Sequence, residues 1–483
     1  MAVTLLFRRV HVVTMDGERR EFADGYLAVE DNRVVGVGDD VDCPYDTAQR
    51  VVDGTGMALL PGFVNAHTHA IHVLMRGGLS DDRSLYDWLF NVILPGLAVY
   101  QREDVALAAR FYCHESLRAG VTTFVDNVEF PVERFDMAAE AALDVYQGSG
   151  LRVAYARMFY DTSPADFDDV VAEVEAREPS VRHDPGGFET AATAMASIEG
   201  LLKRYHGTAD GRIQVWPSPG VAILCTREGL LAAKDLAGRY GSRITLHLAE
   251  SSVDRLQAGM TSIEYLASIG FLGPEVLAGH CVQASPRDID ILAEHDVKVA
   301  NNAVSNMFLA SGIAPVVEMQ AAGVTVGLGT DDANGNNSVN VLADMKVVAL
   351  AQKARTGRAD AITAEKVLEM VTIDGARAVG MADDVGSLEV GKKADVVMVD
   401  LRGSHLWPRH SVASVLVYQA NGSEVDTGVA DGRVLLEGGR VVLRPGEDDE
   451  DTLRARVQAA SERIAAAARL TDYPRRAPRP LGS

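Results

Sequence analysis

Short apolar runs alternate with longer segments of helical periodicity through the middle of the chain. This alternation is typical of βα units, which build parallel sheets. Apolar residues recur at helical spacing over residues 104–119 and 363–379, where we predict helices. The predicted strands are residues 60–67, 121–126, 152–160, 213–219, 243–248, 276–281, 297–301 and 325–331. Eight parallel strands can close a (β/α)8 barrel, so we expect an α/β fold of the TIM-barrel type.

The two ends of the chain instead read as short strands separated by turn-forming residues. Such strands are predicted at residues 5–15, 25–29 and 33–37, and again at 394–400, 414–418, 427–430 and 433–436. We therefore expect residues 1–59 and 386–445 to form one small β-sandwich domain, built from both termini, beside a barrel at 60–385. Residues 446–483 are expected to form a C-terminal helix, at 453–470, and a tail.

Composition narrows the class of function. The chain has 483 residues and a formal net charge of −22, which argues against nucleic acid, because phosphates require Lys and Arg. The acidic balance favours a neutral or cationic small molecule. No apolar run is long enough to span a bilayer and the first residues lack the order of a signal peptide, so we expect no membrane partner and a cytoplasmic location. The four cysteines form no CxxC pair, which argues against a zinc knuckle or a disulfide framework.

Candidate metal ligands are concentrated at the ends of predicted strands. His67 and His69 are two positions apart, so on a strand their side chains point to the same side, about 6.5 Å apart along the backbone. His247, His280 and Asp331 each end a separate apolar run. Because the strand ends of a barrel meet at one rim, this arrangement predicts a metal site there.

Three imidazoles and one carboxylate suit Zn²⁺ or Fe²⁺. Such a metal lowers the pKa of bound water to about 7 and supplies hydroxide, and the reaction then needs an acid/base group nearby. Glu250, three residues after His247, is expected to shuttle protons, although a single Glu could also be a helix N-terminal carboxylate. His280 could be a fourth imidazole ligand or could orient the attacking water. We favour the second role, and we expect Asp331 also to accept a proton from the water.

Long strings of the sequence carry a family resemblance. The chain is identified as a member of the amidohydrolase superfamily, and it resembles the cytosine-deaminase-like branch that includes S-adenosylhomocysteine/methylthioadenosine deaminases and triazine hydrolases. The resemblance covers nearly the whole chain. The strings that carry it are LPGFVNAHTH at 60–69, ESLRAGVTT at 115–123, HLAE at 247–250, GHCV at 279–282, LASGIAPV at 309–316, GTD at 329–331 and GSLEVGKKAD at 386–395.

The resemblance implies a residue-by-residue assignment of the site. His67, His69, His247 and Asp331 would bind one divalent metal, with zinc preferred over iron, and Glu250 would protonate a ring nitrogen. Metal-bound hydroxide would attack a ring carbon bearing an exocyclic amine, and ammonia would leave, as in other zinc deaminases. The implied substrate is a small amino-substituted heterocycle: a purine, an adenine nucleoside, a pterin or an s-triazine. A homo-oligomer, dimer or tetramer, is also implied.

Two positions depart from the family pattern. Asn301 stands where adenosine-type members usually have the His of a His-x-Pro element, which removes an expected substrate contact. Asp332 stands where Gly usually follows the metal-binding Asp. It could place a second carboxylate near the metal, or it could be a loop residue that points to solvent. Both changes bear on the identity of the substrate and leave the metal chemistry intact.

Other side chains are candidate substrate contacts. Trp88 lies in a segment that resembles the family's lid and could stack on a planar heterocycle, or it could pack within a helix. Arg157, late on the third predicted strand, could face the pocket or form a salt bridge inside the barrel. His72 and His114 are expected to be helix residues with structural partners rather than ligands.

The leading hypothesis is therefore a metal-dependent deaminase of a nitrogen heterocycle. One alternative is a hydrolase of the same fold that releases chloride or an alkylamine from a triazine-like ring. Presence of both Glu250 and Asp331 favours deamination. An alternative from another class is an inactive barrel used as a binding module, which the complete ligand set disfavours.

Overall fold

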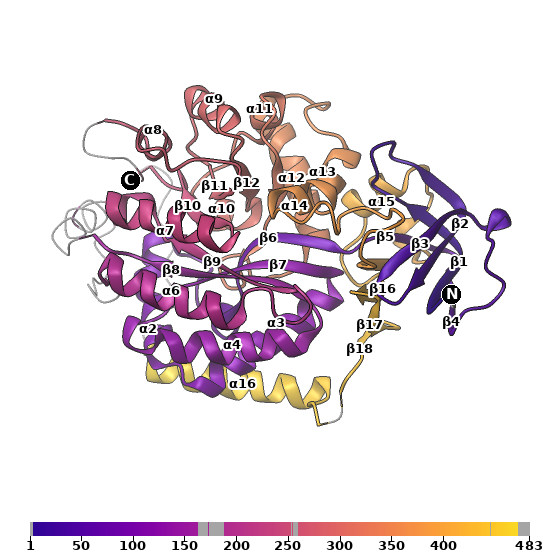
Figure 1. The fold of residues 1–483 in the computed structure, drawn as a ribbon, viewed down its shortest axis with the longest axis horizontal. Helices are drawn as coiled ribbons and strands as arrows, with labels where there is room; N and C mark the ends of the chain where they lie inside the picture. Colours follow the sequence, from indigo (N-terminus) through magenta and orange to yellow (C-terminus); the bar gives the residue numbers. More distant parts are fainter. Residues whose placement is uncertain are drawn as a thin grey trace.

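Strands and helices alternate along the middle of the chain, and both ends contribute strands to a separate sheet (Figure 1). The computed structural model describes residues 3–162, 172, 188–252, 254, 259–444 and 446–471. The predicted tail after residue 471 lies outside the described residues. Mixed α/β content, as expected from the sequence, is therefore the basic character of the fold.

Two parallel sheets form the central part. The first has the strand order β14-β6-β7-β8-β9 and the second the order β10-β11-β12-β13. The strands of the first sheet are β6 (Phe63–His69), β7 (Val121–Val128), β8 (Arg152–Phe159), β9 (Ile213–Pro219) and β14 (Asp331–Asp332). Those of the second are β10 (Ile244–Leu248), β11 (Val276–His280), β12 (Lys298–Asn301) and β13 (Val326–Leu328).

The two parallel sheets are connected at both of their edges. On one side Gly329 and Thr330 lead directly from β13 into β14. On the other, an isolated parallel bridge pairs Val221, just past β9, with His247 of β10. Inward-facing residues of both sheets share one apolar cluster: Val64, Ala66, Val125, Ala154, Ala156, Trp216, Leu277 and Ala300. The C-terminal strand ends therefore converge.

Helices cover the outside of these sheets (Figure 1). The longer ones are α3 (Arg102–Arg118), α4 (Phe135–Ser149), α6 (Ala191–Tyr205), α7 (Arg227–Tyr240), α9 (Pro286–Glu294) and α12 (Val341–Thr356). The shorter ones are α1 (Leu85–Trp88), α2 (Leu94–Val99), α8 (Ser262–Ser268), α10 (Ala303–Phe308), α11 (Val316–Ala321), α13 (Ala364–Met370) and α14 (Ile373–Ala378). The 3-10 helices are η1 (Asp40–Asp42), η2 (Ala70–Met75), η4 (Val132–Arg134), η5 (Ala222–Leu224) and η6 (Ser404–Leu406), and η3 (Leu89–Ile93) is a π-helix.

A nine-stranded sheet joins the two ends of the chain. Its order is β18-β17-β16-β15-β5-β1-β2-β3, with β4 paired to β1. The N-terminal strands are β1 (Leu5–Val13), β2 (Glu21–Glu30), β3 (Arg33–Asp39), β4 (Arg50–Asp53) and β5 (Met57–Pro61). The C-terminal strands are β15 (Val396–Asp400), β16 (Val425–Ala430), β17 (Arg433–Glu437) and β18 (Arg440–Val441). Antiparallel pairing of β5 with β15 connects the two sets.

Several sequence predictions need correction. The strand predicted at 414–418 is wrong, because these residues belong to helix α15 (Val412–Tyr418), which begins at Ser411, whose side chain accepts the backbone N–H of Ser414. The strand predicted at 60–67 is two strands that separate at Gly62, β5 in the terminal sheet and β6 in the central one. The single helix predicted at 363–379 is interrupted at Thr372, since the carbonyl of Val371 accepts the N–H of Val64 instead of continuing the helix. The helix at 104–119 is confirmed as α3.

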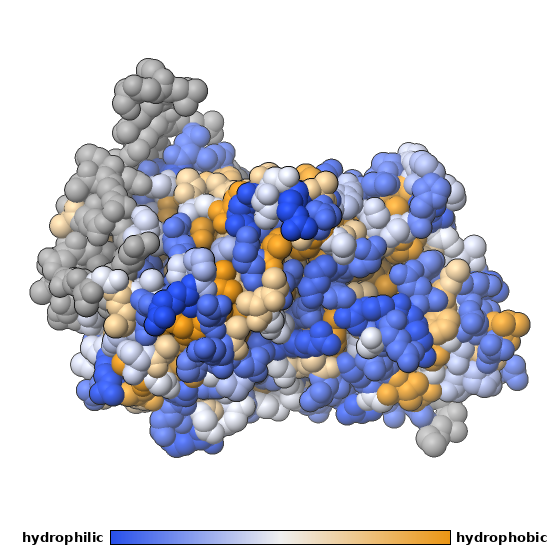
Figure 2. Space-filling model, turned by 90° about the horizontal axis from the view of Figure 1, so that it is seen from above, coloured by the Kyte–Doolittle hydropathy of each residue, from blue (hydrophilic) through white to orange (hydrophobic). Residues whose placement is uncertain are grey.

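The C-terminal helix α16 (Glu450–Ala467) lies along α3 and α2 and contacts η2, the turn that follows the His67–His69 pair (Figure 1). Ion pairs of Arg463 with Asp104 and of Arg118 with Glu450 fix it there. Hydrophilic residues cover most of the face seen from above, with apolar residues in small patches between them (Figure 2). Within the described residues, none of the helices is both long and apolar enough to cross a membrane.

Candidate active site

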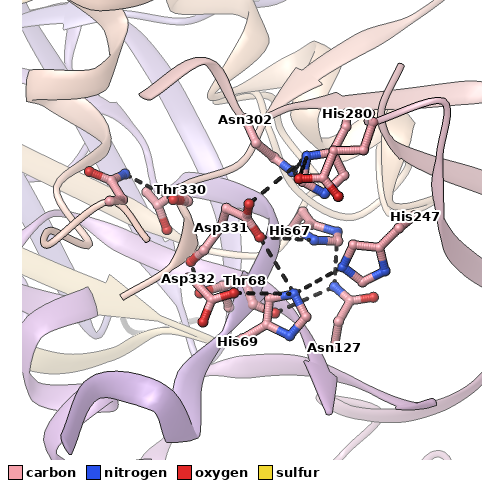
Figure 3. A network of polar contacts seen from close by, with 12 residues as sticks. His67, Thr68, His69, Asn127, His247, His280, Asn302, Thr330, Asp331 and Asp332 are labelled. Carbon is pink, nitrogen blue, oxygen red and sulfur yellow. Dashed lines mark hydrogen bonds and ion pairs between the residues drawn. The ribbon is translucent and has the colours of Figure 1, made fainter. Parts of the chain in front are cut away.

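The predicted metal ligands converge at the C-terminal ends of the parallel strands (Figure 3). His67 and His69 end β6, and His280 ends β11. One donor atom from each of His67, His247, His280 and Asp331 lies within 4.8 Å of the others. Residues that are far apart in the sequence therefore share one centre.

His69 belongs to the same centre. Its Nε2 lies 3.1 Å from Nε2 of His247 and 3.5 Å from Oδ1 of Asp331. Nε2 of His67 lies 3.2 Å from the same carboxylate oxygen. The predicted set of three imidazoles and one carboxylate is thus brought together, with His280 beside it.

The unsatisfied polar atoms fit a divalent metal. Nε2 of His67 and Oδ1 of Asp331 are buried and have no hydrogen-bond partner among the described residues. Burial lowers the pKa of His67, His69 and His247, so these rings are neutral and carry free lone pairs. Burial alone would raise the pKa of Asp331, but attraction to His280 and His67 holds it well below its usual range. Neutral imidazoles around an ionised carboxylate are the forms that ligate Zn²⁺ or Fe²⁺.

Further hydrogen bonds orient the ligand side chains. Nδ1 of His247 lies 3.1 Å from the carbonyl oxygen of Gly220, which directs Nε2 towards the centre. The side-chain amide of Asn127 lies 3.0 Å from Nδ1 of His67. The hydroxyl of Thr68 donates to the backbone carbonyl of Asp331 at 2.9 Å and ties β6 to β14. Such outer contacts typically fix the tautomer and direction of ligating imidazoles.

The backbone is strained at this rim. His280, Asp331 and Ala249 have φ values of +71°, +59° and +50°, in the left-handed region that residues with a Cβ rarely adopt. Each such residue costs about 1–3 kcal/mol and is usually retained where function requires it. Packing at this rim also requires glycine at position 329, because a Cβ added there would lie 2.3 Å from Oδ1 of Asn302.

Glu250 lies beside His280, with Oε1 3.5 Å from Nδ1. Burial raises the pKa of Glu250 to about 7, although the neighbouring His280 opposes this. Burial would lower the pKa of His280, but Glu250 and Asp331 together raise it. Nδ1 of His280 also donates to Oδ1 of Asn306 at 2.8 Å. A carboxyl that titrates near neutral pH is suited to both accepting and donating a proton.

A cavity opens over this centre. Its volume is about 80 Å³. The predicted contact Trp88 lines it, and the indole N–H donates to Oδ1 of Asn334 at 3.3 Å. The lining comprises His69, Leu85, Tyr86, Trp88, Leu89, Glu129, Met158, Tyr160, Val221, His247, Glu250, Ser251, Asp254, His280, Leu309, Asp331 and Asp332.

The two residues that depart from the family pattern differ in whether they line the cavity. Asp332 is buried, bonds Nδ1 of His72 and has Oδ2 3.8 Å from Nε2 of His69, so the solvent-pointing alternative is wrong. Asn301 is buried at the end of β12 and is not among the described lining residues. Arg157 likewise does not line the described cavity and is paired with Glu189, as in the salt-bridge alternative.

Some residues near the centre were not predicted to take part. The His72 ring stacks on that of His69, with centroids 5.3 Å apart and an interplanar angle of 7°. Glu129 directly follows β7 and lines the cavity together with Tyr160. Glu129, like His280, is a polar residue at the end of a strand, so the same pattern could have identified it. It lies outside the sequence strings that carry the family resemblance. His114 lies on α3, outside the lining of this cavity as far as the structure describes it.

Comparison with known proteins gives consistent results. The profile of the Amidohydrolase family matches residues 58–435. An S-triazine hydrolase of Gordonia rubripertincta is 43% identical over 324 residues, 66% of this chain and 66% of that protein. A 5'-deoxyadenosine deaminase of Methanosarcina acetivorans is 34% identical over 467 residues, 96% of this chain and 99% of that protein.

Solved structures resemble the fold over nearly its full length. A zinc-bound adenosine deaminase from Xanthomonas campestris matches with a TM-score of 0.85 and 27% identity, covering 96% of this chain and 99% of that one. A mutant atrazine chlorohydrolase of Arthrobacter aurescens, complexed with zinc and atraton, matches with a TM-score of 0.85 and 26% identity, covering 95% of this chain and 100% of that one.

Proposed function

The chain belongs to the amidohydrolase family, and from this premise we propose that it is a metal-dependent hydrolase that removes an amino group from a nitrogen heterocycle as ammonia. The observation that carries the proposal is the pair of unsatisfied buried atoms, Nε2 of His67 and Oδ1 of Asp331, 3.2 Å apart beside Glu250. The balanced reaction converts the aminoheterocycle and one water into the hydroxy (oxo) heterocycle and ammonia.

We assign His67, His69, His247 and Asp331 as the ligands of one divalent ion, zinc in preference to iron. The donor set suits both ions, and support for zinc comes from the zinc in the structures of the related deaminase and chlorohydrolase. When bound, such an ion activates water for attack at neutral pH.

The chain's own acid and base groups move the protons. Asp331 is placed to accept a proton from the attacking water, because its carboxylate is ionised. Glu250, with a pKa of about 7, donates its proton to the ring nitrogen. The proton held by Asp331 then goes to the departing amine, and Glu250 recovers a proton from the added hydroxyl. His280, held by Asn306, orients the oxygen that adds to the ring carbon.

Purines, adenine nucleosides, pterins and s-triazines are the candidate substrates. Support comes from the names of the relatives, which act on adenine nucleosides and on s-triazines. The aromatic and apolar lining, which includes Tyr86, Trp88 and Met158, suits a planar ring.

We further propose how the chain is organised around this site. The two parallel sheets would form one (β/α)8 barrel at 60–385, and the terminal sheet a β-sandwich domain from 1–59 and 386–445, with 446–483 as an appended helix and tail. Support comes from the two connections between the parallel sheets and the pairing of β5 with β15. Assembly as a homo-oligomer and a cytoplasmic location also remain proposals.

A second reaction fits the same site. Release of chloride or an alkylamine from a triazine is favoured by the likeness to an S-triazine hydrolase and an atrazine chlorohydrolase. An inactive binding module is disfavoured, because the buried donor set is complete.

The test is a panel of aminopurines, adenosine, a pterin, aminotriazines and chlorotriazines, incubated with the full chain reconstituted with zinc. Ammonia, chloride and alkylamine release are measured in parallel. We expect ammonia release, lost in Glu250→Gln. Chloride or alkylamine release without ammonia would establish the second reaction instead. If the metal-loaded protein releases none of the three products, the result would favour the inactive binding module.

A further inference from the structure

A second carboxyl reaches the cavity from another strand. Glu129 follows β7 directly, whereas Glu250 follows β10. Strands β8 and β9 lie between them in the order of strands, and Met158, Tyr160 and Val221, on or just past these strands, also line the cavity. A planar ring lying over the metal ligands would therefore have one carboxyl at each of two separate edges.

The Glu129 carboxyl retains acceptor capacity towards the cavity. The residue is 7% exposed. In the described part of the chain, its polar contacts are the hydroxyl of Tyr160, which donates to it, and Nε2 of His72, 4.0 Å away. A carboxylate offers about four acceptor positions. Because these two contacts leave acceptor positions free, a ligand that brings N–H donors would be selected at this point.

Glu129 is close to the reacting centre. It approaches His72, whose ring stacks on the proposed ligand His69. Only one side chain thus stands between Glu129 and the metal ligands. Because this distance is short, a substituent that reaches Glu129 must be on the same ring as the leaving amino group. A sugar attached at a more distant ring position would lie farther from Glu129.

The charge of the cavity restricts what it admits. Five carboxyl side chains line it: Glu129, Glu250, Asp254, Asp331 and Asp332. Among the described lining residues, none is Lys or Arg. Burial raises the pKa of Glu129, Glu250, Asp254 and Asp332, so these carboxyls act mainly as hydrogen-bonding groups. A phosphate or carboxylate substituent would find no cationic side chain among the described lining residues, whereas a donor-rich ring would find acceptors.

We propose that Glu129 is a specificity-determining residue that selects heterocycles bearing a second amino group, 1,3-related to the one that leaves. The carboxylate accepts the N–H of this amino group, and the Tyr160 hydroxyl holds the carboxylate in place. The inference rests on the proposed deaminase function and names its substrate class: diaminopurines, diaminopyrimidines and diaminotriazines.

The first test compares 2,4-diamino-1,3,5-triazine with 2-amino-4-methyl-1,3,5-triazine, and 2,6-diaminopurine with adenine. In the wild-type chain we expect kcat/KM to be about tenfold or more higher for each diamino compound, because the other member brings no donor to the free acceptor positions of Glu129. Glu129→Gln should bring the ratio close to one, since the Tyr160 hydroxyl would donate to the amide oxygen and leave the NH2 group facing the amino substituent. The matched control is Glu133→Gln, an exposed residue four positions further on, which should leave the ratio unchanged.

Two results would overturn the inference: equal kcat/KM for the methyl and diamino triazines in the wild-type chain, or a preference that survives Glu129→Gln. The wild-type comparison alone decides the matter if Glu129→Gln does not fold. A vicinal diol could also donate to this carboxylate, so adenosine and 2'-deoxyadenosine form a second arm. A Glu129→Gln effect confined to adenosine would assign the carboxyl to a sugar and contradict the inference.

A binding measurement separates this inference from the proposed function. Calorimetry on zinc-loaded Glu250→Gln, with and without Glu129→Gln, compares affinity for 2,4-diamino-1,3,5-triazine and its methyl analogue. One outcome is selective binding that depends on Glu129, while the wild-type chain releases ammonia from none of the amino compounds. This outcome would refute the deaminase proposal and support the inference. Ammonia release without selective binding would do the reverse.

Discussion

Nδ1 of His280 lies 3.5 Å from Oε1 of Glu250, where the ends of the neighbouring strands β10 and β11 meet. The same nitrogen donates to Asn306, so the ring has a fixed orientation beside the carboxyl. Glu250 lies outside the proposed ligand set, while it lines the cavity above it. We therefore expect this pair to carry out proton transfer without binding the metal.

Replacing the Glu250 carboxyl tests this separation. Glu250→Gln keeps the shape and removes the proton carrier, so kcat should fall by about 10²–10⁴-fold. Metal content should stay at the wild-type level, because no ligand is removed. Steady-state ammonia release and elemental analysis of the same sample measure both. Retention of more than about a tenth of wild-type kcat would assign proton transfer to another group.

The sequence predicts the ligand set because each ligand lies in a local pattern. His67, His247 and Asp331 follow apolar runs, and parallel strand ends converge whatever the loops do. The first predicted strand divides at Pro61-Gly62, which is a turn-forming pair. The apolar residues on both sides of this pair favour a single strand in the sequence. Residues 414–418 predict a strand because Val415, Val417 and Tyr418 favour strands, but they belong to α15.

Contacts made only in three dimensions could not be predicted. Nothing local to Asp332 shows that His72, 260 positions away in sequence, bonds to it. The sequence around Arg157 fits a pocket residue and an ion-pair partner equally well, and only the structure shows that Glu189 pairs with it. Burial of Glu129 likewise depends on Tyr160 and on helices that are remote in sequence.

Trp88 should contribute to substrate affinity. Its ring lines the cavity and its N–H bonds Asn334. Aromatic stacking is worth about 0.5–1.5 kcal/mol, so Trp88→Ala should raise KM by about 3–10-fold or more, and Trp88→Phe by less. The control is Trp407→Ala, since Trp407 is 56% exposed and packs on Arg409. An unchanged KM in Trp88→Ala would make this Trp a packing residue only.

Asp344 should make stability depend on pH. Burial raises its pKa from 3.8 to about 8, although Asn336 donates to it at 2.8 Å. The folded state thus binds this proton more tightly than the unfolded chain does. Its stabilising effect is complete below pH 4 and is lost as the pH rises towards 8.

Asp344→Asn removes this titration and leaves an amide oxygen to accept from Asn336. The variant should melt on the order of 2–5 °C higher than wild type at pH 8, with a smaller difference at pH 5. Thermal melts at the two pH values measure this. The exposed Asp290→Asn on α9 is the control and should show no such pH-dependent gap. A constant difference at both pH values would contradict burial of an ionisable Asp344.

The central claim is that one divalent ion is shared by His67, His69, His247 and Asp331, and elemental analysis combined with ammonia release tests it most directly. We predict about one metal per wild-type chain, and loss of both metal and ammonia release in His69→Ala. The control His11→Ala, which alters a partly exposed residue paired with Glu21, should keep both. A His69→Ala protein that is folded and still retains its metal and its ammonia release would contradict the account.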